Sequence, residues 1–81
     1  MRLDKYLKVS RIIKRRTVAN EACDAGRVLV DGKPARASYD VKVGDVIEVS
    51  LGVRSMKLRV LEVSEYATKE TAGRLFEELP Q

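Results

Sequence analysis

The sequence predicts an α+β protein: two short N-terminal helices packed on a small, mostly antiparallel sheet of four to five strands, followed by a C-terminal helix. Three observations predict this class. Apolar residues recur at helical spacing near the N-terminus, they alternate with polar residues between positions 46 and 60, and helical spacing returns after position 68. Helices and strands that are segregated along a chain are typical of α+β folds rather than of parallel βαβ units.

The size and composition exclude many classes of function. With 81 residues the chain can form one domain with a thin core, which leaves no room for a deep substrate chamber. It has no histidine and a single cysteine, Cys23, so we expect no disulfide scaffold, zinc finger, catalytic triad, metal or cofactor. No run approaches 18 apolar residues, and the N-terminus lacks the apolar core of a secretory signal. We therefore expect a cytoplasmic, non-enzymatic protein that does not engage membranes.

The first predicted helix covers residues 2–8. Leu3, Tyr6 and Leu7 fall at positions i, i+3 and i+4 and form one apolar stripe, so Tyr6 is expected in the core. Residues 9–16 mix apolar and basic side chains, and we interpret them as an irregular connection that two isoleucines anchor to the core.

A second helix is predicted over residues 18–25. Thr17 is the expected N-cap, Glu21 would lie in the first turn, and Gly26 is the expected stop. Cys23 lies on the apolar face of small residues and is expected to be a buried, unreactive thiol.

Strands follow the helices. Residues 27–30 and 33–37 flank Asp31-Gly32, a pair that favours a two-residue type I′ hairpin turn because both positions require positive φ. Residues 46–51 and 56–60 alternate apolar and polar, with a turn between them.

The final segment, residues 68–79, is predicted to be an amphipathic helix. Four apolar residues fall at helical spacing, namely Ala72, Leu75, Phe76 and Leu79, although Gly73 lowers the helix propensity. Pro80 prevents continuation.

Positive charge is concentrated in the first half of the chain. Residues 1–36 hold ten Lys and Arg against four Asp and Glu, a net charge of +6, whereas residues 60–81 hold two against five, a net charge of −3. Such an asymmetry draws one end of a protein toward polyanions. We expect these cations to lie together on one exposed flank and to grip RNA phosphates. The candidate RNA-binding residues are Arg2, Lys5, Lys8, Arg11, Lys14, Arg15 and Arg16, with Lys33 and Arg36 on the hairpin as additions that could extend the surface or face away.

Aromatic residues are scarce, which argues against a module that stacks on single strands. Tyr39, beside the hairpin, is the aromatic residue that we consider for base stacking. The profile fits recognition of folded RNA through shape and backbone.

Three segments resemble the RNA-binding domain named after small-subunit ribosomal protein S-four, also called the alpha-L motif. They are RLDKYL at 2–7, RRTVANEACDAGRVLVDGKPA at 15–35 and VKVGDVIEV at 41–49. Asp31 departs from the family pattern, which usually has Asn before the glycine, but both residues tolerate the turn. The resemblance implies that Arg2 and Arg16 contact RNA.

The stand-alone forms that the chain resembles are bacterial ribosome-associated quality-control proteins and heat-shock-protein-fifteen-like proteins. The resemblance implies a protein that binds ribosomal RNA and tRNA on an obstructed large ribosomal subunit and assists a factor that adds alanine tails to the stalled chain. We expect it to be a monomer. We expect an RNA-binding domain over residues 1–63, with the motif core at 2–51, and an acidic C-terminal helix over residues 64–81 packed on it.

Other interpretations remain open at this point. A ribosome-recycling or heat-shock RNA-binding factor would use the same surface. A protein–protein adaptor would place the basic face on an acidic partner. A DNA-binding helix-turn-helix protein is disfavoured because the connection between the helices is too long for a three- to four-residue turn. The chain could also be an accessory domain whose catalytic partner is another chain.

Overall fold

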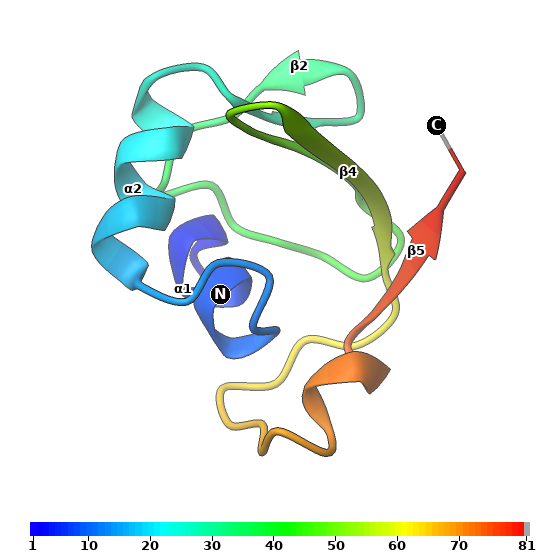
Figure 1. The fold of residues 1–81 in the computed structure, drawn as a ribbon. Coiled ribbons are helices and arrows are strands. Elements are labelled where there is room, and N and C mark those ends of the chain that lie inside the picture. Colours follow the sequence, from blue (N-terminus) through cyan, green and yellow to red (C-terminus); the bar gives the residue numbers. More distant parts are fainter. Residues whose placement is uncertain (81) are drawn as a thin grey trace.

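The computed structural model describes residues 1–80 as two helices packed on one face of a five-stranded sheet. Figure 1 shows the helices on one side, the sheet on the other, and the segment before the last strand looping below the first helix. The α+β class and the antiparallel sheet are confirmed. No helix in the described part of the chain is long and apolar enough to cross a membrane.

The two helices are α1 (Leu3–Val9) and α2 (Arg16–Asp24). Helix α1 forms where its apolar stripe predicted it, with Tyr6 fully buried. Helix α2 begins at Arg16, earlier than expected. Its N-cap residue is Arg15, which makes no side-chain capping bond. The predicted cap at Thr17 is therefore wrong, and the first turn holds no acidic residue.

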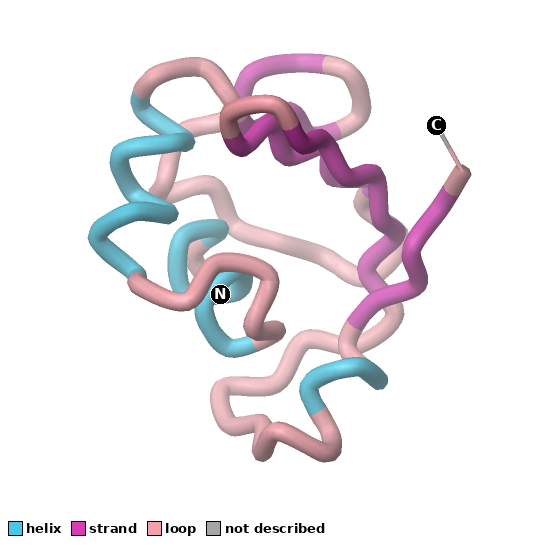
Figure 2. Tube along the Cα trace, viewed as in Figure 1, coloured by secondary structure: helices cyan, strands magenta, loops and turns pink. Residues whose placement is uncertain are grey.

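The strands are β1 (Val28–Val30), β2 (Lys33–Pro34), β3 (Val46–Leu51), β4 (Arg54–Val60) and β5 (Phe76–Leu79). Their order in the sheet is β2-β1-β3-β4-β5, and every pair is antiparallel. Figure 2 shows the strands in magenta and the helices in cyan. The β1–β2 turn has the positive φ angles that the sequence predicted, 51° at Asp31 and 83° at Gly32.

The core lies between the helices and the inner face of the sheet. Cross-strand neighbours such as Ile47 and Leu58 are fully buried, whereas Glu48 and Lys57 form the adjacent pair on the outer face. Alternation of this kind lets one face pack against helices while the other meets water. Helix α1 contributes Leu3, Tyr6 and Leu7, and the connection contributes Ile13, as the apolar spacing predicted.

The predicted C-terminal helix over residues 68–79 is wrong. The segment contains a short 3-10 helix, η1 (Ala72–Arg74), and then strand β5, which pairs with β4 from Lys57 to Val60. The apolar spacing did identify residues that face the core, because Ala72 and Leu75 are buried. The backbone differs because the free edge of β4 offers hydrogen-bonding partners to an extended chain, and Gly73 weakens any competing helix.

One side-chain bond ties the end of the chain to α1. The buried Tyr6 hydroxyl donates to the carbonyl oxygen of Leu75 at 2.6 Å, and the backbone N–H groups of Leu61 and Glu62 donate to the same oxygen. Burial raises the pKa of the Tyr6 hydroxyl well above its ordinary range, so the group remains a donor. The loop over residues 61–75 is thereby held beneath α1.

Replacing Tyr6 by phenylalanine removes this donor and leaves the ring in place. We expect the Y6F variant to lose about 1 kcal/mol of unfolding free energy, the usual net contribution of one such hydrogen bond. Urea denaturation followed by circular dichroism measures the change. The matched control is Y66F, because Tyr66 is 87% exposed and should tolerate the same deletion without effect. Equal midpoints for Y6F and Y66F would contradict the role of this bond.

Candidate nucleic-acid interface

A buried carboxylate joins the two helices at the basic end of the molecule. Asp4 is only 1% exposed, and its oxygens lie 3.3 Å from Nε of Arg2 and 3.4 Å from Nε of Arg16. It also accepts hydrogen bonds from the Asn20 side chain at 3.1 Å and from the backbone N–H of Lys5 at 2.8 Å. The two arginine side chains remain 51% and 44% exposed, so each guanidinium has one edge on Asp4 and the rest in solvent.

The local sequence explains how this cluster forms. Arg16 and Asn20 are four residues apart on α2 and therefore lie on one face of the helix. Asp4 is in the first turn of α1, where its backbone N–H donates to the carbonyl oxygen of Ala37 and fixes the end of the helix. Arg2 is drawn to the same carboxylate from just before α1.

The surroundings keep Asp4 ionised. Burial by itself raises the pKa of this carboxyl, but hydrogen bonds from Asn20, Arg16 and the Lys5 N–H, together with the charge of Arg16, outweigh burial and hold the pKa below its ordinary value. One negative charge thus orients two positive charges, and the cluster keeps a net positive charge.

Four of the predicted cations are exposed and lack a carboxylate partner. Among residues 1–80, no Asp or Glu oxygen lies within 4.0 Å of the charged groups of Lys8, Arg11, Lys14 and Arg15. Lys5 is half-buried and lies 3.6 Å from Glu65 of the loop beneath α1. The available positive charge therefore extends from the Asp4 cluster along the end of α1 and the connection to α2.

Arg11 adopts an unusual backbone conformation. Its φ is +64°, and it follows Ser10, the C-cap of α1, at a position where glycine is usual. A residue with a Cβ in this region is strained by about 1 kcal/mol. The residue at this strained position is nevertheless an arginine, so a guanidinium group lies where the chain leaves α1.

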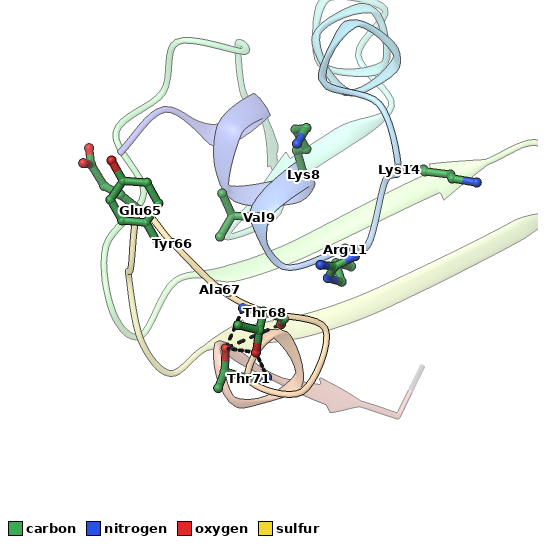
Figure 3. A pocket seen from close by; sticks show the side chains of 9 residues that line it. All are labelled: Lys8, Val9, Arg11, Lys14, Glu65, Tyr66, Ala67, Thr68 and Thr71. Carbon is green, nitrogen blue, oxygen red and sulfur yellow. Dashed lines mark hydrogen bonds between the residues drawn. The ribbon is translucent and has the colours of Figure 1, made fainter.

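A pocket of about 670 Å³ opens beside these cations. One wall carries Lys8, Val9, Arg11 and Lys14, and the other is formed by the loop, with Glu65, Tyr66, Ala67, Thr68 and Thr71. In Figure 3, Arg11 comes from the connection on one side of the pocket and Thr68 from the loop on the other, whereas Lys14 extends outward from the connection. The loop is internally bonded, since the Thr71 hydroxyl accepts from the Thr68 N–H at 2.9 Å.

The hairpin residues lie elsewhere. Lys33 and Arg36 border a second pocket of about 660 Å³ that also includes Tyr39. Tyr39 is half-buried; its hydroxyl donates to Asp45 at 2.9 Å, and the Lys42 ammonium lies 6.0 Å from its ring centroid. The structure thus divides seven of the predicted site residues among the Asp4 cluster, the pocket beside Arg11, and the hairpin. The side chains of Lys5 and Arg15 belong to none of these three groups.

Sequence reasoning misses three contributors to the site. It counts Asp4 only toward the net charge of residues 1–36, although Asp4 is three positions before Leu7 and borders the predicted apolar stripe. It also passes over Asn20, which is four residues from Arg16. Tyr66 gives no local signal, because its place in the pocket depends on how the loop folds back.

Cys23 is buried, as expected. Burial, with smaller contributions from the charges of Asp4 and Asp24, raises the pKa of its thiol to about 11. The thiolate is the reactive form, so this cysteine is a poor nucleophile at neutral pH.

Comparison with known proteins identifies the family. The model of the S4 domain matches residues 1–47, and the chain is 52% identical over 77 residues to the "RQC P-site tRNA stabilizing factor" of Streptococcus pneumoniae, covering 95% of this chain and 88% of that protein. The chain belongs to the S4 domain family. A second relative in the family, of the same name, from Bacillus subtilis is 47% identical over 76 residues, covering 94% of this chain and 88% of that protein.

The solved structures agree with the S4 assignment. The chain superposes on heat shock protein 15 of Vibrio cholerae with a TM-score of 0.91 and 28% identity, covering 98% of this chain and 81% of that one. That structure is described as trimeric. The resemblance to the S-four-type domain and to the heat-shock-protein-fifteen-like proteins is therefore confirmed, as is the fold of two helices on a sheet.

Substitution of Asp4 by asparagine tests the buried cluster. The pKa of the Asp4 carboxyl is lower in the folded protein than in the unfolded chain. Such a group stabilises the fold at pH values above its unfolded pKa, and the stabilisation is lost as the pH falls through its folded pKa. We expect D4N to reduce the unfolding free energy by about 1–3 kcal/mol at pH 7. The difference from the wild type should shrink as the pH falls below the ordinary carboxyl value of 3.8.

Urea denaturation at a series of pH values measures this dependence. The control is D24N, which removes the same charge from an exposed position at the end of α2. A D4N penalty that stays constant between pH 7 and pH 2.5 would show that the Asp4 charge is not the source of the stabilisation.

Proposed function

We propose that this chain is a non-enzymatic RNA-binding protein whose basic surface contacts the phosphate backbone of folded RNA. The observation that carries the proposal is the arginine pair, Arg2 and Arg16, held in place by Asp4 while both side chains stay about half exposed. Arginine in a fixed orientation suits bidentate binding of phosphate oxygens. The free cations Lys8, Arg11, Lys14 and Arg15 would supply the remaining attraction, with Lys5 at their edge.

The RNA that we propose is found on the large ribosomal subunit. Relatives of 52% and 47% identity are named RQC P-site tRNA stabilizing factors, and the chain spans 88% of each. We infer that this chain contacts ribosomal RNA and P-site tRNA on an obstructed large subunit in ribosome quality control. Holding the tRNA in place would assist a partner factor that extends the stalled chain with alanine.

We also propose how the chain is divided and in what state it acts. Residues 1–63 would form the RNA-binding domain, with the motif core at 2–51, and residues 64–80 would pack against it as an acidic extension that contains β5. The protein would act as a cytoplasmic monomer. Lys33 and Arg36 would reach RNA only if the bound RNA extends to the β1–β2 hairpin.

A second candidate function has a specific observation in its favour. The superposition on heat shock protein 15 covers nearly the whole chain, so a recycling or heat-shock role on the ribosome would use the same surface. The two roles differ in what retains the protein on the subunit. A tRNA-stabilising factor prefers subunits that carry P-site tRNA, and a factor that recognises ribosomal RNA alone binds empty subunits equally well.

Neutralising the free cations tests the proposal. We expect the K8Q/R11Q/K14Q variant to bind large subunits carrying P-site tRNA at least tenfold more weakly than the wild type. Each phosphate that the variant no longer neutralises should reduce the slope of log K against log salt by about one, so a reduction of up to about three is expected. Co-sedimentation over a series of KCl concentrations measures both quantities, with empty subunits in parallel.

The matched control is R54Q/K57Q/R59Q, which removes the same charge from strand β4. The ion pairs that it breaks, Lys57 with Glu48 and Arg59 with Glu77, are on the surface and contribute little to stability. If both triple variants weaken binding equally, net charge alone explains the attraction to RNA and no defined basic surface is needed. The proposal then fails.

A further inference from the structure

The pocket between Arg11 and Tyr66 has the features of a site for an unpaired nucleotide. Tyr66 is the most exposed aromatic side chain, at 87%, and it lies on the wall opposite Lys8 and Arg11. Its backbone is fixed, because the Ser64 hydroxyl donates to the Tyr66 carbonyl oxygen at 2.8 Å. No hydrogen bond of the Tyr66 hydroxyl and no ring contact of this residue is found among residues 1–80. The ring face is therefore available for stacking.

The charges around the pocket favour a phosphate-bearing ligand. Three lining residues are cations without a carboxylate partner among residues 1–80, and the one lining carboxylate, Glu65, is offset by Lys5 at 3.6 Å. The hydroxyls of Thr68 and Thr71 also line the pocket, and they bond to each other and to the backbone of the loop, which holds this wall together. The volume, about 670 Å³, lies within the roughly 300–1,000 Å³ typical of small-ligand pockets.

The backbone of Arg11 is a second, independent observation. Its φ of +64° at the position after the C-cap of α1 is one that glycine would adopt without strain. Strained positions of this kind are concentrated at sites of function, because the structure retains them for what the side chain does. Here the residue lines the same pocket as Tyr66, and Figure 3 shows the two on different sides of it.

We propose that this pocket binds one extrahelical nucleotide of the bound RNA, with the base stacked on Tyr66 and the flanking phosphates on Lys8 and Arg11. The inference rests on the proposed RNA-binding function and adds a specificity to it. A base inside a duplex has no free face for a tyrosine ring, so the pocket distinguishes RNA with a bulged or flipped base from a regular helix. The Asp4 cluster would contact the backbone in both cases.

The experiment compares two RNA hairpins of the same stem, one with a single bulged 2-aminopurine and one fully paired. Stacking of one base contributes about a five- to 150-fold difference in affinity. We expect the wild-type chain to bind the bulged hairpin at least fivefold more tightly than the paired hairpin and to quench the 2-aminopurine fluorescence. Y66A should remove both the preference and the quenching while affinity for the paired hairpin is unchanged, and Y66F should behave as wild type.

Two further variants separate binding from folding. V53A, at the fully exposed tip of the β3–β4 hairpin, is the control for removal of an exposed side chain and should bind as wild type. R11G removes the guanidinium and relieves the strain at this position, so it should bind RNA several-fold more weakly while its urea midpoint stays equal or rises. A lowered midpoint would show that the backbone of Arg11 is not strained.

The outcomes distinguish the two claims. If the wild-type chain binds neither hairpin, both the proposed RNA-binding function and this inference fail. If it binds both hairpins equally and Y66A matches the wild type, the nucleotide pocket is overturned while RNA binding stands. If Y66A weakens binding of a glutamate-rich peptide but not of the bulged hairpin, the pocket is a protein-docking site and the inference is overturned as well.

Discussion

The buried Asp4 carboxylate is the interaction on which the basic surface depends. It is the one acidic group among the described residues that is fully removed from solvent, and three side chains and one backbone N–H donate to it. Removing a charge from water is costly unless it is paired and hydrogen-bonded, so this arrangement fixes the relation between α1 and α2. The same bonds orient Arg2 and Arg16 before any ligand arrives, which reduces the entropy that binding must overcome.

The C-terminal segment extends the sheet and forms part of the pocket, a role that its acidic composition did not suggest. Strand β5 extends the sheet at β4, and Tyr6 holds Leu75 against α1. The loop between them then lies beside the cations at the end of α1 and forms the second wall of the pocket. Residues that carry little positive charge thus shape the site, while the first third of the chain supplies its attraction for polyanions.

Local patterns in the sequence predicted the helices, the Asp31-Gly32 hairpin and the core residues, because each depends on neighbours within a few positions. The cationic residues could also be predicted, since the positions of Lys and Arg are read directly from the sequence. The final strand could not, because the spacing of Ala72, Leu75 and Phe76 is that of a helix, whereas pairing with β4, which is distant in the sequence, makes Phe76–Leu79 a strand. The role of Asp4 was hidden for the same reason, as its partner Asn20 is 16 residues away.

A cryo-electron microscopy structure of the chain on a large ribosomal subunit that carries P-site tRNA would show directly what the arginine pair binds. We expect Arg2 and Arg16 each to lie within about 3 Å of RNA phosphate oxygens while both retain their contact with Asp4. We also expect the outer face of the sheet, with Glu48 and Arg59, to be turned away from RNA. A complex in which that outer face contacts the RNA and the two arginines remain in solvent would rule out the role of the arginine pair.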